Sequence, residues 1–221
     1  MSGKSEAWQK IPVSRIEILS DAVVGAGLEA VQMNSGRLSG SLVSCERDGV
    51  TFSSGAIDGT VSLKGTLSER NVTVGVVLEA VPGSWHWLKE IQAGSVGVFR
   101  AGDTHDALYR SSAMYVAATL SLDRLELEAA REGLVLDGAT LGGSRLHPTL
   151  MEPSLVEHFR SGFADLHRSA PYQPAFQDAD VAGRLLRDLI AHFARHPRLL
   201  SGQGRSPGHE RIVARARDYI H

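Results

Sequence analysis

The chain has 221 residues, of which 43% are hydrophobic, so it is long enough to bury a sizeable core and to form one full domain with an appendage. Its 23 lysines and arginines against 25 acidic residues give a formal net charge of −2, which shows no basic footprint for nucleic-acid or membrane binding. The single cysteine, Cys45, excludes an intramolecular disulfide, and the absence of a signal-peptide core or a long apolar window favours a cytoplasmic protein without a membrane span.

Strand patterns dominate the first 120 residues. A short capped helix, predicted to begin at Ser20 and to extend towards Ala30, precedes the strands. Alternating apolar residues separated by Gly, Asp, Asn or Pro turns then predict eight short strands, at residues 37–44, 50–54, 60–64, 72–80, 85–89, 96–100, 106–109 and 114–120. Strands of this number and spacing are typical of a β-barrel or a β-sandwich.

Two tryptophans lie two residues apart in the predicted strand 85–89. Because side chains alternate along a strand, Trp85 and Trp87 are expected on one face, with His86 and Leu88 on the other. The paired indoles would form a platform for stacking a ligand ring if they line a cavity, and would be part of the core if they do not. Both interpretations stay open from the sequence.

The segment 94–109 carries the most informative pattern in the chain. A strand at 96–100 is broken at Gly102, whose backbone tolerates positive φ, and the chain then returns with His105 and Tyr109 on one face. This pattern predicts a hairpin that feeds a pocket or the core. His105 is then either a partly buried histidine bonded to the backbone or a polar contact to an organic ligand, and Tyr109 joins it in the candidate site.

Two arginines complete the candidate site. Guanidinium groups bind phosphate or carboxylate through paired hydrogen bonds, and Arg37 and Arg100 both belong to the predicted barrel region. Most arginines are solvated surface residues. Arg100 is singled out because it precedes the turn at Gly102 and is expected to reach the mouth of the barrel.

Metal binding and catalysis are both expected to be absent. A borderline cation needs three or four converging ligands, and His86 and His105 are the only imidazoles before residue 147. The sequence has no nucleophile elbow, phosphate loop or zinc-protease motif, and Cys45 has no evident activating base. We therefore expect a metal-free protein that is not an enzyme, and a metal-dependent isomerase or dioxygenase is the alternative.

After Leu120 the apolar period changes from two residues to about 3.6, which predicts helices. A first helix begins near Asp123, and a glycine-rich loop at 133–150 leads to two more amphipathic helices, joined by a connection that contains Pro171 and Pro174. The apolar stripes of this helical hairpin must pack on each other, on the barrel or on a second copy of the chain. The candidate dimer surface consists of Leu155, Phe159, Phe163, Leu185 and Leu189.

The end of the chain has a different composition. Residues 198–209 are rich in Gly and Ser and predict a linker, and residues 210–221 predict a basic amphipathic helix in which the chain stops. We expect that a further domain has been cut off there. The predicted organisation is thus an N-terminal segment (1–30), a barrel (31–121), a helical linker and hairpin (122–197), the Gly/Ser linker and the start of the missing domain.

The spacing within 94–109 resembles the second cupin motif, in which Gly, Pro, Gly, His and Asn recur at fixed intervals. Here the two glycines and His105 keep their places, whereas Arg100 replaces the proline and Tyr109 replaces the asparagine. Metal-dependent cupins draw further ligands from an earlier His-x-His and a Glu, but the first 85 residues contain no histidine. The resemblance implies an α+β fold in which a cupin-like double-stranded β-barrel is followed by the helical hairpin.

The segment from Arg211 to Ile220 resembles the first helix of the helix-turn-helix domain of AraC-type transcription regulators. Segments 32–42 and 94–125 are similar to the branch of that family that includes ethanolamine-operon regulators. The resemblance implies a domain that binds a small-molecule or nucleotide effector such as cyclic di-GMP, a homodimer formed through the helices, and promoter DNA as the partner of a helix-turn-helix region beyond this chain. The effector is expected, without a cofactor, at Arg37, Trp85, Trp87, Arg100, His105 and Tyr109.

Overall fold

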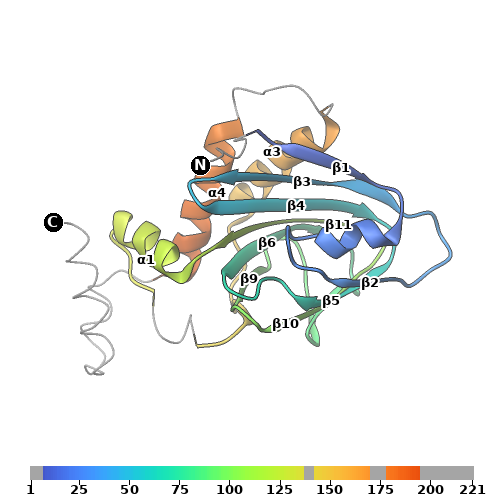
Figure 1. Cartoon of the computed structure of the whole chain (residues 1–221), viewed down its shortest axis with the longest axis horizontal. Coiled ribbons are helices and arrows are strands. Elements are labelled where there is room, and N and C mark those ends of the chain that lie inside the picture. The colour runs from blue at the N-terminus through green and yellow to red at the C-terminus, as the bar shows by residue number, and fades with distance from the viewer. Residues whose placement is uncertain (1–6, 137–141, 170–177, 195–221) are drawn as a thin grey trace.

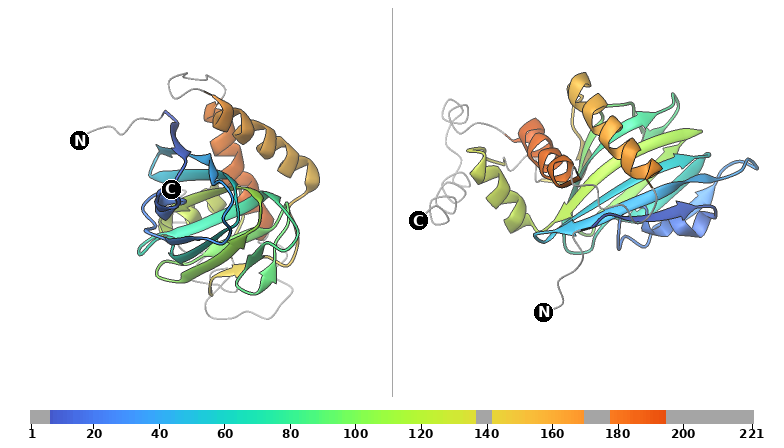
Figure 2. Two further views of the ribbon diagram at one scale, coloured as in Figure 1. Left: turned by 90° about the vertical axis from the view of Figure 1, so that its right-hand side faces the viewer. Right: turned by 90° about the horizontal axis from the view of Figure 1, so that it is seen from above.

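The computed structural model describes residues 7–136, 142–169 and 178–194. Two antiparallel sheets face each other, and helices cover the outer face of the larger sheet (Figures 1 and 2). The sheets do not share strands, so the β region is a cupin-like sandwich and not a continuous closed barrel. The predicted α+β fold class is confirmed.

Seven strands form the larger sheet, in the spatial order β1-β3-β4-β11-β6-β9-β12. Its central strands are buried on both faces, which explains why β6 is an almost unbroken apolar run. The bounds are Gln9–Val13 (β1), Ser39–Arg47 (β3), Val50–Asp58 (β4), Val72–Ala80 (β6), Val96–Phe99 (β9), Ser112–Leu120 (β11) and Arg145–Leu146 (β12).

Five strands form the smaller sheet, in the order β2-β5-β10-β7-β8. Along β10, buried and more exposed residues alternate, with His105 and Tyr109 turned towards the larger sheet, which confirms the face predicted for them. The bounds are Glu29–Gln32 (β2), Val61–Thr66 (β5), Trp85–His86 (β7), Lys89–Glu90 (β8) and Thr104–Tyr109 (β10).

The helices are α1 (Leu122–Arg131), α3 (Pro153–Arg168) and α4 (Asp178–Phe193), together with a 3-10 helix at Ile16–Asp21. Helix α3 packs on β3, β4 and β6, and α4 packs on β6, α1 and α3. Figure 2 shows both helices on one side of the strands. No helix within the described ranges is long and apolar enough to cross a membrane.

The larger sheet separates two hydrophobic clusters. One cluster fills the space between this sheet and the helices and includes Val116, Phe159 and Leu185. The other cluster lies between the two sheets and includes Leu63 and Tyr109. Because β11 contributes alternate residues to both clusters, it connects the inner space between the sheets with the layer of helices.

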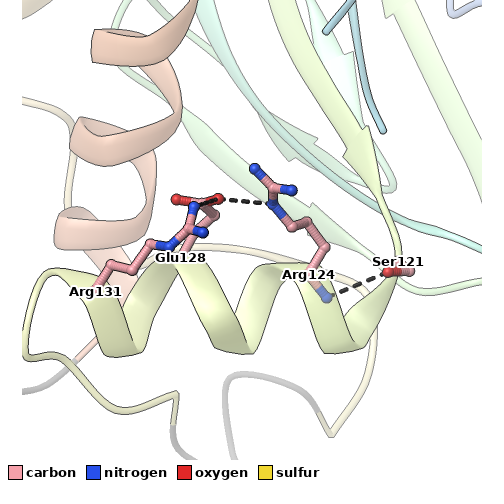
Figure 3. Close-up of polar contacts among 4 residues, drawn as sticks. All are labelled: Ser121, Arg124, Glu128 and Arg131. Carbon is pink, nitrogen blue, oxygen red and sulfur yellow. Dashed lines mark hydrogen bonds and ion pairs between the residues drawn. The ribbon is translucent and has the colours of Figure 1, made fainter. Parts of the chain in front are cut away.

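Helix α1 begins with a capped first turn (Figure 3). The hydroxyl of Ser121 accepts a hydrogen bond of 3.2 Å from the backbone nitrogen of Arg124. One turn further, Glu128 accepts from Arg124 at 2.6 Å and from Arg131 at 2.8 Å. Arg124 and Glu128 are partly buried and line a hollow with residues of α4, while Leu125 is fully buried in the core.

The helix predicted from Ser20 to Ala30 is wrong. The chain instead forms the 3-10 helix at Ile16–Asp21, and β2 begins at Glu29. Between them, Gly25 and Gly27 adopt φ values of 79° and 63°, which end helical geometry. Three short strands that the sequence pattern did not reveal, β1, β2 and β12, are added to the predicted set.

The predicted hairpin at 96–109 is also wrong, although both of its strands exist. Strand β9 pairs with β6 and β12 in the larger sheet, whereas β10 pairs with β5 and β7 in the smaller sheet. The turn at Gly102, with φ of 80°, therefore carries the chain from one sheet to the other.

The predicted strand 85–89 is in fact a tight hairpin. Strands β7 and β8 pair antiparallel, with Trp85 opposite Glu90, and only Trp87 and Leu88 form the turn between them. The expectation that both tryptophans lie on one face of a single strand is therefore wrong. The connection with Pro171 and Pro174, the linker at 198–209 and the segment 210–221 lie outside the described residues.

Candidate functional site

A cavity of about 50 Å³ lies between the two sheets. A space of this size holds a few water molecules at most, and it is well below the roughly 300 Å³ at which ligand pockets begin. A larger ligand would therefore enter only if the wall moves. Most lining side chains are apolar, and the polar ones are Thr73, His86, Ser95, His105, Tyr109 and Tyr115.

Two histidines from neighbouring strands meet in the wall of this cavity. His86 Nε2 in β7 and His105 Nδ1 in β10 are 2.7 Å apart, so one imidazole donates a hydrogen bond to the other. The His86 ring also packs edge-on against Trp87 and Phe99, with ring centroids 4.2 and 5.2 Å away. These contacts fix the orientation of the pair.

Both imidazoles of the pair are neutral. Burial, together with the neighbouring His105, lowers the pKa of His86 far below its usual value of 6.5. Burial lowers the pKa of His105 to about 4. Within the described residues, the buried Nδ1 of His86 has no hydrogen-bond partner. Leaving such a group unpaired costs about 1–3 kcal/mol, so this nitrogen is a candidate contact for a bound molecule.

Two tyrosines form another part of the wall, Tyr109 from β10 and Tyr115 from β11. The rings of Tyr109 and Tyr115 stack with centroids 6.0 Å apart, and the Tyr115 hydroxyl donates a hydrogen bond of 2.5 Å to the carbonyl of Ala22. Burial raises the pKa of both phenols, so they stay protonated. Tyr115 lies directly over Gly55, where a Cβ atom would come within 2.5 Å of the phenol oxygen.

The structure brings only part of the predicted effector site together. His105 and Tyr109 line the cavity, and Trp87 packs against its wall from outside. Trp85, which is 42% exposed, lies on the outer face of the smaller sheet. Arg37 and Arg100 are exposed and do not line the cavity.

Sequence reasoning missed Tyr115, and it placed His86 away from the tryptophans without assigning it a role. The period-two pattern of β11 is visible in the sequence. Both faces of that strand are buried, however, so the pattern does not say which face meets the cavity. The position of His86 depends on the hairpin turn after it. That turn consists of Trp87 and Leu88 and contains none of the residues, such as Asn or Gly, from which a turn is predicted.

The cavity residues do not fit a metal ion. A transition metal in a cupin would need three or four converging ligands, and no three His, Cys, Asp or Glu side chains gather anywhere in the part of the chain that the structure describes. His86 and His105 direct their facing nitrogens at each other, as their hydrogen bond shows. No metal chemistry is therefore assigned to this site.

The residues chosen as a dimer surface are part of the core of the single chain. Phe159, Phe163, Leu185 and Leu189 are fully buried and Leu155 is half-buried, between the helices and the larger sheet. The sequence left three packing partners open for the apolar stripes of the two helices: the other helix, the β region or a second copy of the chain. In the structure the stripes pack on the other helix and on the larger sheet. A homodimer remains a prediction, and in this arrangement these five side chains are not free to form its surface.

A third neutral histidine attaches α3 to the larger sheet. His167 Nδ1 lies 2.8 Å from the hydroxyl of Ser41, and its Nε2 lies 3.0 Å from the hydroxyl of Ser54. Ser54 itself donates to the carbonyl of Tyr115, so His167 donates to Ser54 and accepts from Ser41. Burial, and secondarily Lys10, lowers the pKa of His167 to about 4. These contacts orient the helix.

No protein-family model matches the chain, and no curated protein matches it in sequence. Solved structures with a related fold include the AraC-like transcriptional activator CuxR, with 10% identity, a TM-score of 0.45 and coverage of 75% of this chain. The chain spans 60% of the length of that activator.

Two further solved structures belong to smaller proteins. One is described as a predicted oxalate decarboxylase from Thermotoga maritima, with 14% identity, a TM-score of 0.31 and coverage of 50% of this chain and 99% of that one. The other is a cupin 2 conserved barrel domain protein from Salinispora arenicola, with 10% identity, a TM-score of 0.29 and coverage of 47% and 84%. At these identities the similarity concerns the fold alone.

Proposed function

We propose that this chain is the effector-sensing part of an AraC-type transcription regulator and that it binds a small organic molecule between its two sheets. The observation that carries the proposal is the cavity there, whose wall holds a buried histidine nitrogen without a partner. The order of segments in the sequence supports the regulatory role, because a cupin-like region and a helical hairpin precede a basic amphipathic segment.

The chemistry of the wall favours binding over catalysis. A general acid or base works best with a pKa near the operating pH, whereas the pKa of His105 is lowered to about 4 and those of both tyrosines are raised. Such groups donate and accept hydrogen bonds without exchanging protons at neutral pH. We therefore propose that the chain is not an enzyme and that the bound molecule leaves unchanged.

The larger sheet supplies a route from the cavity to the helices. Val76 and Val116 line the cavity and also belong to the cluster on which α3 and α4 pack. A ligand that requires a shift of β6 or β11 would favour one position of the helical hairpin over another. In the proposed regulator, acting in the cytoplasm as a homodimer, this shift would control how a DNA-binding region after the hairpin meets promoter DNA.

The test is a thermal-shift screen of organic acids, amines, sugars and nucleotides, cyclic di-GMP included, followed by native mass spectrometry of the compounds that stabilise the chain. A ligand present at 100 times its Kd should stabilise the fold by about 2.7 kcal/mol. Replacing Ala117, which lines the cavity, with Val should weaken binding, whereas Ala101→Val on the surface should not. A stoichiometric transition metal, or conversion of a bound compound, would contradict the proposal.

A further inference from the structure

A groove lies immediately outside the cavity, at the β7–β8 turn. Its volume is about 500 Å³, and residues of this turn, of the β9–β10 turn and of β12 line it. Leu146 of β12 lines both the groove and the inner cavity. The two spaces are therefore separated by a thin wall, and the groove is large enough for the part of a ligand that the cavity cannot hold.

The indole of Trp87 forms part of that wall. It faces the groove, and its ring packs on His86 and Phe99, both of which line the cavity. Its Nε1 donates a hydrogen bond of 2.9 Å to the carbonyl of Thr104, and its backbone nitrogen donates one of 2.8 Å to the carbonyl of Asp106. Displacing this one side chain would uncover the His86 ring.

The turn that carries Trp87 is strained. Trp87 and Leu88 have φ values of 50° and 83°, in a two-residue hairpin turn that usually takes Asn and Gly. Residues other than glycine are disfavoured in this conformation, because the Cβ atom comes too close to the backbone carbonyl oxygen. Leu88 gains no packing in return, because it is 96% exposed. Strain and an exposed leucine at the edge of the groove are consistent with a site that a ligand completes.

Two cations in the groove have no internal partner. The side chains of Lys89 and Arg145 make no ion pair or hydrogen bond within the described residues. The carboxylate in the groove, Asp103, already accepts hydrogen bonds from the backbone nitrogen and the hydroxyl of Ser144, at 3.2 and 2.6 Å. The groove thus combines free positive charge with apolar surface from Trp87 and its neighbours.

Resting on the proposed function, we infer that the effector is an organic acid with an apolar body. Its carboxylate binds Lys89 and Arg145 in the groove, and its body passes Trp87 and reaches the cavity beside His86. The charges decide the orientation: the inner wall carries only neutral polar groups, so the charged end of the ligand stays outside.

The experiment uses the whole chain and a series of probes: straight-chain carboxylates from hexanoate to decanoate, 4-phenylbutyrate, and the primary amide of each. Affinity is measured by calorimetry. At least one carboxylate should bind about tenfold more tightly than its amide, and a Lys89→Met/Arg145→Met double variant should remove this difference. Lys64→Met is the matched control and should preserve it, because Lys64 is an exposed lysine on β5 of the smaller sheet that does not line the groove.

A second readout follows Trp87 directly. In a variant with Trp8→Phe and Trp85→Phe, Trp87 is the remaining tryptophan of the chain, and its emission should change on binding of the carboxylate. Equal affinity for acid and amide would overturn the carboxylate assignment while leaving a ligand between the sheets. No binding by any carboxylate of the series would overturn the ligand class. The proposed function is tested separately: it fails if the broad screen also finds no ligand, or if it finds a stoichiometric transition metal or conversion of a bound compound.

Discussion

His86, His105 and His167 are held in surroundings that lower the pKa of their rings, to about 4 for His105 and His167 and further for His86. In the unfolded chain the same rings titrate near 6.5. Below that pH the histidines take up protons in the unfolded state but stay neutral in the folded state. Their contribution to the free energy of unfolding is therefore fully present above pH 6.5 and is lost as the pH falls towards 4.

Replacing His105 with Gln should reduce this acid sensitivity. Each histidine that stays neutral in the fold contributes at most about 1.4 kcal/mol of unfolding free energy per pH unit between pH 6.5 and 4. We expect the variant to show a shallower slope in urea unfolding experiments over that range. The slope above pH 7 is the internal control, because the rings are neutral there in both states. An unchanged slope at acid pH would show that His105 is charged in the fold.

Gly55 is expected to be needed for the position of Tyr115. A Cβ atom at residue 55 would overlap the Tyr115 ring, which is buried and bonded to Ala22, so the ring must leave its place in the cavity wall. Gly55→Ala should cost about 1–3 kcal/mol in urea denaturation. Gly143→Ala, where a Cβ atom meets nothing within 4 Å, is the control and should change stability by less than about 0.5 kcal/mol. Equal effects of the two substitutions would contradict the described packing.

At the level of elements, the start of α1 depends on one hydroxyl. Ser121 caps the helix through the backbone nitrogen of Arg124 (Figure 3). Ser121→Ala should therefore lower the unfolding free energy by about 1 kcal/mol, whereas Ser121→Asp keeps an acceptor and should keep most of the stability. Guanidinium denaturation of the unchanged chain and of the two variants measures both changes in unfolding free energy. A loss of the same size in both variants would argue against the cap.

The stripe of α3 gives a prediction that separates core from interface. Phe163 of α3 is fully buried in the core that the helices form with the larger sheet, and its ring centroid lies 5.6 Å from that of Trp8. Phe163→Ala should lower the unfolding free energy by about 3–5 kcal/mol at every protein concentration, and Ser161→Ala on the exposed side should have little effect. A loss that appears only at concentrations where the chain self-associates would show instead that Phe163 belongs to a dimer surface.

Local patterns in the sequence were enough for much of the fold. Strand β6 was predicted at its observed bounds, 72–80, and the stripes of α3 and α4 follow from helical periodicity. Pairing was not predictable in the same way, because β9 and β10 find partners far away in the chain and not each other. The turn at Trp87 was missed because its residues contradict the usual preference for Asn and Gly at positive φ.

The candidate site was predicted only in part for the same reasons. His105 and Tyr109 were found because β10 has one buried and one exposed face, so alternation alone orients them. Tyr115 lies on a strand buried on both sides, where alternation does not distinguish the cavity from the helices. Arg37 was chosen for its chemistry and Arg100 also for its place before the turn at Gly102, and the structure places both at the surface.

At the scale of the whole molecule, the larger sheet is a layer shared by two cores. One face of β6 and β11 closes the space that holds the histidine pair, and the other face supports the helical hairpin. A molecule bound between the sheets thus contacts strands that the helices also contact. This arrangement is what the proposed sensor needs, because binding and output then depend on the same packed layer.

The most direct test of a ligand between the sheets is the imidazole ¹⁵N spectrum of the histidine-labelled chain, recorded with and without a compound that raises its Tm. The proposal predicts that the ring nitrogens of His86 and His105 shift on binding, since His86 Nδ1 gains a partner, while those of His158, exposed on α3, do not. Saturable binding that leaves the His86 and His105 signals unchanged would place the ligand elsewhere and contradict the central claim.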